Sequence, residues 1–514
     1  MSLVLTATAV SATSSVVNAE FGLPVAGNAT VVAAKKKLSV GFDSTCYLRS
    51  EGHVVCWGRD WNGGLGIGWG QRATGDAANE MGSNLQRTLV TTSTPYYKPV
   101  KAAAVFAGGE QTCVYDVADK LHCVGANSNG ALGQSTGNQG PGYYQWADDT
   151  SAIDLGDGRT IIDLANGGDS SANWGQNNFH CALLDNSNVK CWGTNSEGQL
   201  GLGDTAHRGD NAGEMGDNLP VVNLGTGVTA TAVVAGFRYA CAIVTGGSVA
   251  SGSVKCWGDN SFGQLGLGDT NNRGDAAGEM GDSLPVVNLG TGRTAVAITA
   301  SYGTTCAVLD NGKVVCWGYN FNGNLGRDLA TTGNASNIGD AAGEMGSSLV
   351  AVNLGTNYVA TQVTAGWQHT CALLNDSVTV KCWGANWAGQ LGQGDTTNRG
   401  DNTNTIGSAS AVALGLNNGE TILSIESGMG SHTCVLTSSS RVKCWGNNSS
   451  GQLGVGNSSN KGDGANEMGA NLQEADVSGP NTPTEVRDPV VTPAATSVTF
   501  SFSAPETANG TIID

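Results

Sequence analysis

The chain has 514 residues, of which 39% are hydrophobic and only 13% charged, and its formal net charge is −18. Such an acidic surface repels phosphate, and the only basic run is Lys35-Lys36-Lys37, so the composition argues against a nucleic-acid partner. No run of 18 apolar residues is present, and we expect no membrane insertion. The 77 glycines follow no three-residue period and indicate many tight turns, which predicts an all-β chain of short strands.

The N-terminus resembles a secretory signal in part. Residues 1–19 are small and apolar and end in Val17-Asn18-Ala19, an acceptable cleavage site, although they lack a positively charged start. We therefore expect a signal peptide at 1–19, with an ordinary N-terminal segment as the alternative. Residues 20–36 follow as a second N-terminal segment. Within it, residues 27–34 (GNATVVAA) suit either a strand that closes the fold or a free tail.

The fourteen cysteines form seven pairs whose first members recur every 60 to 68 residues. The phrase around the fifth pair, TCAVLDNGKVVCWG at 305–318, predicts a β-hairpin with strands at 305–309 and 313–317 and a turn at Asp310-Asn311-Gly312. In that register the two cysteines face each other, which predicts one disulfide per hairpin; buried free thiols are the alternative. The predicted disulfides are Cys46–Cys56, Cys113–Cys123, Cys181–Cys191, Cys241–Cys256, Cys306–Cys316, Cys371–Cys382 and Cys434–Cys444.

One copy of the hairpin departs in length. Cys241 and Cys256 are fifteen residues apart, and we expect the extra residues to form a glycine-serine loop at Gly246–Gly252. A tryptophan follows the second cysteine in every copy except the second, where Val124 stands. Because one hairpin sheet cannot bury both of its faces alone, neighbouring sheets must stack, and these tryptophans are expected to pack between them.

Each hairpin is followed by N-x-x-G-x-L-G, as in Asn260-Ser261-Phe262-Gly263-Gln264-Leu265-Gly266. Together, the phrase C-A-L…V-x-C-W-G-x-N-x-x-G-Q-L-G resembles the regulator-of-chromosome-condensation repeat across residues 37–475. The resemblance implies a seven-bladed β-propeller at 37–475. Members include an exchange factor for a nuclear GTPase, a plant photoreceptor, ubiquitin-ligase regulators and a secreted enzyme inhibitor. The paired cysteines depart from the intracellular members, which argues against a nuclear role.

A second phrase, Gly-Asp-x-x-x-Glu-Met-Gly, recurs five times between the hairpins, for example within 208–224 and 273–289. We expect a structural turn in which the aspartate accepts backbone hydrogen bonds and the methionine fills an apolar gap. Calcium is the competing hypothesis, because clustered carboxylates and carbonyls suit that ion; we expect no other cofactor. The calcium candidates are Asp210, Glu214, Asp217, Asp275, Glu279 and Asp282.

Other surface motifs carry weaker signals. Arg-Gly-Asp occurs at 208–210, 273–275 and 399–401, always inside the repeated loop, so its multiplicity follows from the repeat. N-glycosylation sequons would make the chain a glycoprotein in a suitable host. They lie at Asn28, Asn334, Asn375, Asn447, Asn448, Asn457 and Asn509.

Catalysis has little support in the sequence. No H-E-x-x-H, G-x-S-x-G or P-loop motif occurs, and no cysteine is left over as a nucleophile or zinc ligand, so we expect no catalytic residues and no enzyme. The only obvious aromatic cluster is Tyr143, Tyr144 and Trp146 in a long loop.

The composition changes near residue 476. Residues 476–496 are rich in proline and predict a linker, and the alternating Ser497-Val498-Thr499-Phe500-Ser501-Phe502 predicts a strand. Residues 497–514 resemble the start of a fibronectin type III domain, so we expect partial β-sandwich strands after the propeller.

These features predict a non-enzymatic structural or adhesive module of a larger surface assembly, either extracellular or on the cell surface. Its partners would be protein or glycan bound through the loops, with self-assembly or other subunits of an extracellular structure also open. Two alternatives remain: an intracellular exchange-factor-like regulator of a small GTPase, and a secreted protein inhibitor of an enzyme. Oxidised cysteines would favour the first and third hypotheses over the second.

Overall fold

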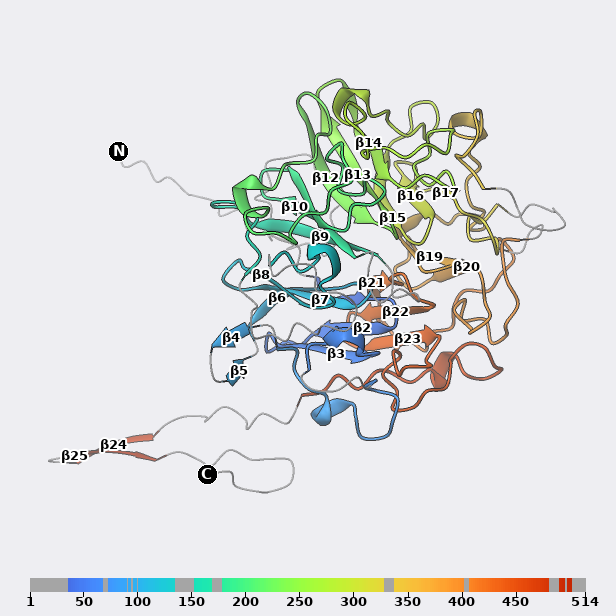
Figure 1. Ribbon diagram of the computed structural model, residues 1–514. Coiled ribbons are helices and arrows are strands. Elements are labelled where there is room, and N and C mark those ends of the chain that lie inside the picture. The colour runs from blue at the N-terminus through green and yellow to red at the C-terminus, as the bar shows by residue number, and fades with distance from the viewer. Residues whose placement is uncertain are drawn as a thin grey trace, which may run out of the picture.

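The computed structural model describes residues 36–67, 73–89, 91–93, 96–98, 100–134, 152–168, 178–327, 337–401, 406–479, 490–494 and 497–501. Its regular structure there is almost entirely β, with only short 3-10 turns. Seven antiparallel sheets of three strands each are arranged in a ring, as Figure 1 shows. The predicted all-β, seven-bladed propeller is confirmed.

Each blade is built from three consecutive strands, so no blade mixes strands from the two ends of the described chain. Among the described residues, two further hairpins lie outside the blades: β4 (Thr91–Ser93) with β5 (Tyr96–Lys98), and β24 (Val490–Ala494) with β25 (Ser497–Ser501). The blades are, in order, β1 (Leu38–Val40), β2 (Ser44–Leu48) and β3 (Val54–Gly58); β6 (Ala102–Ala107), β7 (Gln111–Asp116) and β8 (Leu121–Gly125); β9 (Ile161–Gly167), β10 (Phe179–Leu184) and β11 (Val189–Gly193); β12 (Val228–Ala235), β13 (Tyr239–Gly246) and β14 (Val249–Gly258); β15 (Ala295–Ala300), β16 (Thr304–Leu309) and β17 (Val314–Gly318); β18 (Ala360–Ala365), β19 (His369–Leu374) and β20 (Val380–Gly384); β21 (Ile422–Glu426), β22 (His432–Thr437) and β23 (Val442–Gly446).

The hairpin of the fifth blade has the predicted register. Cys306 lies directly opposite Cys316, and Gly312 in the turn has a φ of +73°, a conformation that glycine adopts without steric cost. All seven predicted pairs are disulfide-bonded, with Cα–Cα separations of 4.0 to 4.1 Å. The fourth blade differs from expectation: β14 begins at Val249, so most of the expected glycine-serine loop is strand, and the hairpin is simply longer.

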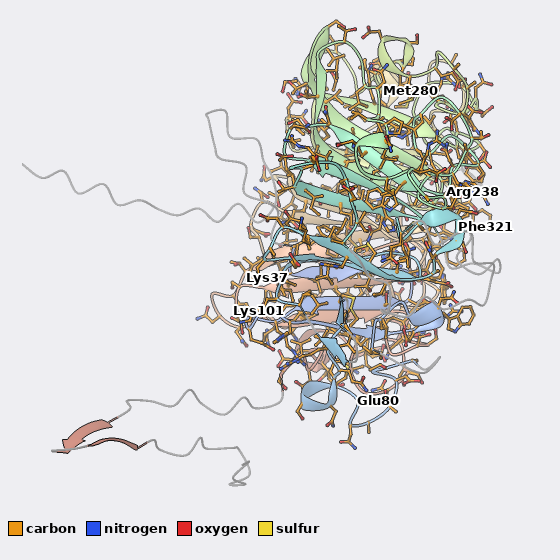
Figure 2. All side chains as sticks on the ribbon, turned by 60° about the vertical axis from the view of Figure 1, so that its left-hand side comes forward. Lys37, Glu80, Lys101, Arg238, Met280 and Phe321 are labelled. Atoms are coloured by element: carbon orange, nitrogen blue, oxygen red, sulfur yellow. A yellow bond between two sulfur atoms is a disulfide. The ribbon has the colours of Figure 1, made fainter. Side chains whose placement is uncertain are left out.

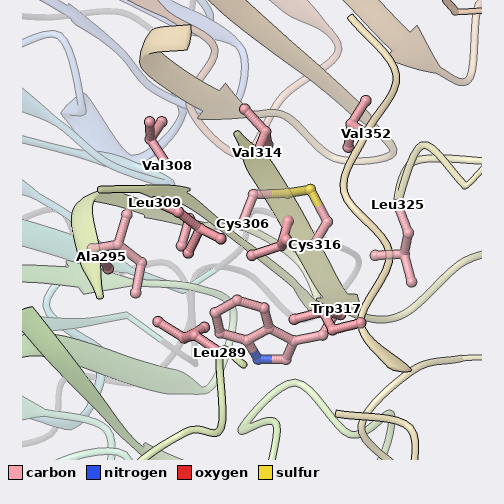
Figure 3. Packing of buried hydrophobic residues seen from close by; sticks show 14 of the residues in the cluster. Leu289, Ala295, Cys306, Val308, Leu309, Val314, Cys316, Trp317, Leu325 and Val352 are labelled. Atoms are coloured by element: carbon pink, nitrogen blue, oxygen red, sulfur yellow. A yellow bond between two sulfur atoms is a disulfide. The ribbon is translucent and has the colours of Figure 1, made fainter. Parts of the chain in front are cut away.

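The core lies between neighbouring blades, where each tryptophan after the second cysteine is buried (Figure 3). Trp317 belongs to a core cluster that spans three successive blades, and its indole Nε1 donates to the Gln264 carbonyl of the preceding blade at 3.0 Å. The same bond recurs wherever the tryptophan is present, which confirms their predicted packing role. The six donors are Trp57, Trp192, Trp257, Trp317, Trp383 and Trp445.

The asparagine of N-x-x-G-x-L-G is an internal anchor for its loop. Asn260 is fully buried, and its Oδ1 accepts the backbone N–H of Leu265 at 3.0 Å. All seven blades make this bond, but in the first blade the acceptor is the carboxylate of Asp60, which bonds Leu65. The remaining pairs are Asn127–Leu132, Asn195–Leu200, Asn320–Leu325, Asn386–Leu391 and Asn448–Leu453.

The ring closes through contacts between its first and last blades. Trp57 donates to the Gln452 carbonyl at 3.0 Å, the same bond that joins other neighbours. Arg49 then holds the end of the propeller, donating from Nε to the Val477 carbonyl and from Nη2 to the Ser478 carbonyl, each at 2.7 Å. These contacts lie just after residue 475, where the sequence places the end of the propeller, and that boundary stays a prediction. The predicted closing strand at 27–34 lies outside the described residues.

Beyond the propeller, β24 (Val490–Ala494) pairs with β25 (Ser497–Ser501) as an antiparallel hairpin. The strand expected at 497–502 is present, and its partner lies inside the segment predicted as linker. Whether this hairpin opens a fibronectin type III domain stays a prediction.

Between the first two blades, β4 (Thr91–Ser93) pairs with β5 (Tyr96–Lys98). Within the described residues, no helix is long and apolar enough to cross a bilayer.

Candidate recognition surface

One face of the ring, here called the loop face, collects two kinds of loop from every blade. Because neighbouring strands are antiparallel, the loop that joins the first strand to the second and the loop that follows the third strand lie at the same end of each sheet. Figure 2 shows Arg238 and Phe321, which belong to these loops, on one side of the disc, and Lys37 and Lys101 on the other.

Five aromatic rings from the fourth and fifth blades meet on the loop face. We call them the aromatic crescent: Phe237, Phe262, Tyr302, Tyr319 and Phe321. Phe237 stacks on Tyr302 with centroids 5.3 Å apart, Phe262 lies 4.8 Å from Tyr319, and Tyr319 lies parallel to Phe321 at 6.0 Å. Phe321 remains 50% exposed, so the crescent presents an apolar surface to solvent.

The position of the exposed rings follows from the buried anchor. Phe321 comes directly after Asn320, and Trp387, also 50% exposed, comes directly after Asn386 in the next blade. In both blades the anchor side chain is buried and the aromatic residue after it is exposed. Trp61 occupies the same position in the first blade, after Asp60, and is 38% exposed.

Two arginines already lie against rings of this face. The guanidinium of Arg238 lies 4.6 Å from the Phe237 centroid and 3.5 Å from the Glu197 carboxylate. Arg59 lies over the Trp61 ring, 3.0 Å from its centroid, and pairs with Asp43 at 2.9 Å. Aromatic rings attract cations through their negative faces, so both contacts are favourable.

The repeated Gly-Asp-x-x-x-Glu-Met-Gly loop is a structural turn, but the glutamate rather than the predicted aspartate satisfies its backbone. Glu279 Oε2 accepts from the N–H groups of Gly274 at 2.9 Å and Ala276 at 3.0 Å. The other four copies repeat both bonds, through Glu80, Glu214, Glu344 and Glu467. Met280 packs against the neighbouring hydrophobic core, as predicted.

The calcium candidates are only partly brought together. Partial burial, and then the adjacent Glu279 carboxylate, raise the pKa of Asp275, whereas Asp282 accepts from Thr226 N–H and Oγ1. The first set divides in the same way: burial and the neighbouring Glu214 raise the pKa of Asp210. Asp217 instead accepts from the Asp157 N–H at 3.2 Å. Calcium binding stays a prediction.

Among the described residues, a single trio of His, Cys, Asp or Glu ligand atoms lies within 4.8 Å: Cys113, Cys123 and His180. The two sulfurs form a disulfide and have no thiolate to offer a metal. His180, His369 and His432 are buried, and burial lowers the pKa of each to about 3. The last two hydrogen-bond hydroxyls of the next blade, so these side chains join blades and are closed to substrate.

The arginine of each Arg-Gly-Asp motif is tied down within its own blade. Arg273 pairs with Asp269 at 2.7 Å and forms a backbone bridge with Gly258. Arg208 and Arg399 repeat the ion pair with the aspartates four residues before them. The Arg-Gly-Asp loops are therefore structural parts of the propeller, with each arginine held by an ion pair in its own blade.

The asparagines of the predicted N-glycosylation sequons differ in their exposure to solvent. Asn375 is exposed, and Asn447 and Asn457 are partly exposed. Asn448 is buried in the folded chain, and its amide donates to the carbonyls of Asn457 and Ser459; glycosylation there, as at the other candidates, stays a prediction. The candidates Asn28, Asn334 and Asn509 lie outside the described residues.

Sequence reasoning missed the aromatic crescent. The cluster it singled out, Tyr143, Tyr144 and Trp146, lies outside the described residues, and its description as the only cluster is wrong. The crescent residues are far apart in sequence and become neighbours only when two blades stack. One signal was available: the residue after the repeated anchor is aromatic in three blades.

Comparison with known proteins supports this architecture. A family model described as the regulator of chromosome condensation repeat matches residues 36–63, 295–324, 360–390 and 422–452, and a second model of that description matches 251–308. The chain carries regulator-of-chromosome-condensation repeats. The four matches of the first model include the hairpin phrases of the first, fifth, sixth and seventh blades, and the second model covers the end of the fourth-blade hairpin and the start of the fifth blade.

Curated relatives with these repeats differ in role. The chain is 27% identical over 285 residues to the ultraviolet-B receptor UVR8 of Arabidopsis thaliana, covering 54% of this chain and 53% of that protein. It is 31% identical over 218 residues to the probable E3 ubiquitin-protein ligase HERC4 of Mus musculus, covering 42% of this chain but 18% of the ligase. The chain thus spans about half of the receptor and under a fifth of the ligase.

Solved structures agree on the fold. Prp20p of Saccharomyces cerevisiae, described with its binding to Gsp1p and histones, has a TM-score of 0.57 at 19% identity, covering 82% of this chain and 86% of its own. Human WBSCR16 has a TM-score of 0.54 at 18% identity, covering 84% and 94%. At such identities the likeness establishes the propeller alone.

Proposed function

We propose that this chain is a non-enzymatic recognition module that binds a protein partner through the aromatic crescent together with the exposed Trp387 of the next blade, and works outside the reducing cytosol. The carrying observation is the crescent itself. Its rings stand on a rigid frame and remain partly exposed, and aromatic residues with arginine are what protein interfaces enrich at their centres.

The compartment is proposed from the disulfides. One disulfide joins the last two strands of each of the seven blades, and such bonds persist in secreted and surface proteins but are rare in the cytosol. A regulator acting on a GTPase in the cytosol would need the same fold with reduced cysteines. The proposal therefore favours an extracellular or cell-surface setting.

Protein binding is proposed over glycan binding because structural neighbours are described with protein partners. Prp20p is named with Gsp1p and histones, and another structure holds Kap60 bound to yeast RCC1. A non-catalytic role is supported by cysteines held in disulfides and by the buried histidines. Continuation into further domains after β25 would suit an adhesive or structural assembly.

The compartment is tested by intact mass of the native protein after thiol alkylation without reduction. Full protection of all 14 cysteines, with peptide mapping that returns the within-blade pairs, is the expected result. Fourteen alkylated thiols would overturn the extracellular part of the proposal and leave a reduced intracellular regulator.

Binding is tested by capture from the secreted and surface fraction of the native source. The bait is the wild-type chain, the double variant Phe321→Ala/Trp387→Ala, or the control Val286→Ala, which removes an exposed apolar side chain elsewhere. A partner retained by wild type and control but lost by the double variant supports the proposal. Partners that ignore the double variant would place recognition on another surface and refute the role of the crescent.

A further inference from the structure

Resting on that proposed function, we infer that the partner presents a basic polypeptide segment to the loop face. Its arginine or lysine side chains stack on Phe321 and Trp387 and face the acidic loops beside these rings. The inference rests on three independent features: the rings, the acidic border and the absence of lysine.

The loop face itself uses aromatic–guanidinium contacts. Arg238 lies against Phe237 and Arg59 lies over Trp61, so both rings have a cation supplied by the chain. Phe321 and Trp387 are the most exposed aromatic side chains in the described parts of the chain, and no such contact is found for them there. A cation from a partner would complete the arrangement that the face already shows twice.

Acidic turns border the same loops. The backbone of Gly263, in the loop that carries Phe262, packs closely against Asp340, and Gly389, two residues after Trp387, packs in the same way against Asp463. Each aspartate shares its turn with a glutamate four residues later, and for Asp340 partial burial and this glutamate raise the pKa. Two carboxylates held together gain from a nearby positive charge, because it offsets their mutual repulsion.

The crescent offers no competing flexible cation. The loops at 236–238, 259–268, 301–303, 319–327, 366–368 and 385–394 contain no lysine, and their arginines are Arg238 and Arg327. Arg238 is already paired with Glu197. With a net charge of −18, the chain attracts a basic segment over a distance and repels a second copy of itself.

The test uses three fluorescein-labelled peptides of equal length, acetyl-(Arg-Gly)4-amide, acetyl-(Gln-Gly)4-amide and acetyl-(Glu-Gly)4-amide, and measures fluorescence anisotropy with the oxidised full chain. We expect the arginine peptide to bind at least about tenfold more tightly than the glutamine peptide, and to weaken about fivefold when salt rises from about 20 to about 200 mM. The glutamate peptide should not bind.

Variants separate the two contributions. Phe321→Ala and Trp387→Ala should each weaken arginine-peptide binding about three- to tenfold, and Asp340→Asn about threefold. Val286→Ala and Asp157→Asn, exposed positions away from the crescent, should change nothing. Urea unfolding of every variant checks that the fold is kept.

Two results would overturn the inference. One is equal binding of the arginine and glutamine peptides, or arginine-peptide binding that Phe321→Ala and Trp387→Ala leave unchanged. The other is self-association of the chain, seen by sedimentation and lost in Trp387→Ala, which would make a second copy the occupant. If the captured native partner still depends on the crescent but is insensitive to salt, the proposed function stands and only the basic chemistry is wrong.

Discussion

The inter-blade turns and the loop-face loops of this propeller repeat to different degrees. The five Gly-Asp-x-x-x-Glu-Met-Gly turns make identical contacts: a glutamate accepts two backbone N–H groups and a methionine packs between blades. The loops of the loop face share their buried anchor, but the next residue is serine in four blades and aromatic in three. In these two sets of loops the repeated side chains stabilise the propeller, whereas the variable position after the anchor carries the exposed aromatic side chains Trp61, Phe321 and Trp387.

The largest expected effect is acid sensitivity of the frame. His180, His369 and His432 are buried with pKa values near 3, below the ordinary value of 6.5, so only the unfolded chain takes up their protons between those pH values. Stability should therefore fall as pH drops below about 6.5, by about 1.4 kcal/mol per pH unit for each histidine. Urea unfolding at several pH values measures this slope.

The variant His369→Gln should keep the bond to the Thr433 hydroxyl and remove one histidine's share of the slope. Phe321→Ala, on the loop face, should leave the slope as it is. A slope that His369→Gln does not reduce would mean that other groups govern the acid response.

A smaller effect concerns the one anchor that departs from the repeat. In the first blade a buried carboxylate, that of Asp60, takes the place of the asparagine found in the other blades. Burial raises the pKa of Asp60 to about 6. Asp60→Asn should therefore raise the free energy of unfolding at pH 7 by about 2–3 kcal/mol. The gain should shrink as pH falls from about 6 towards the ordinary value of 3.8, because the folded carboxyl becomes protonated over this range, and it should disappear below that pH, where the carboxyl is protonated in both states.

Urea titrations of wild type and Asp60→Asn at pH 7 and pH 4 decide this point. The matched control is Asp259→Asn, a partly exposed carboxylate beside the repeated anchor of the fourth blade. Loss of stability in Asp60→Asn at pH 7 would show that the ionised carboxylate has a favourable partner.

The smallest effect separates frame from surface most directly. Glu279→Ala leaves the N–H groups of Gly274 and Ala276 without their acceptor and should cost about 1–3 kcal/mol of unfolding free energy. Phe321→Ala, on the loop face, should change stability by about 0.5 kcal/mol or less and act on binding instead. Chemical denaturation of both, beside Glu279→Gln, gives the comparison; equal losses would remove the distinction between the two classes of loop.

The sequence predicted the frame because its determinants are local. Hairpin register, the glycine turn and the cysteine pairing depend on residues about ten positions apart, so Cys306 and Cys316 could be paired from spacing alone. The repeat likewise predicted buried tryptophans. The longer fourth hairpin was missed because Gly252 and its serine neighbours suggested a loop, whereas pairing between strands outweighs their weak strand preference.

The recognition surface could not be predicted in the same way. Phe237 and Phe321 are separated by more than a blade in sequence, and their neighbourhood exists only after stacking. The sequence also could not show that the glutamate of the repeated turn accepts the backbone hydrogen bonds, since the aspartate of the same turn is equally able to accept them. Calcium binding, the compartment and the C-terminal domain remain predictions.

The bond between Trp57 and the Gln452 carbonyl has a consequence for assembly during synthesis. Each disulfide joins cysteines 10 to 15 residues apart, so a blade can be oxidised as soon as its hairpin leaves the ribosome or the translocation pore. The first blade, in contrast, meets late acceptors: its indole bonds a carbonyl 395 residues further along the chain, and Arg49 bonds one 428 residues further along. Until then its outer face is uncovered, so the nascent chain is a row of finished blades with one exposed end.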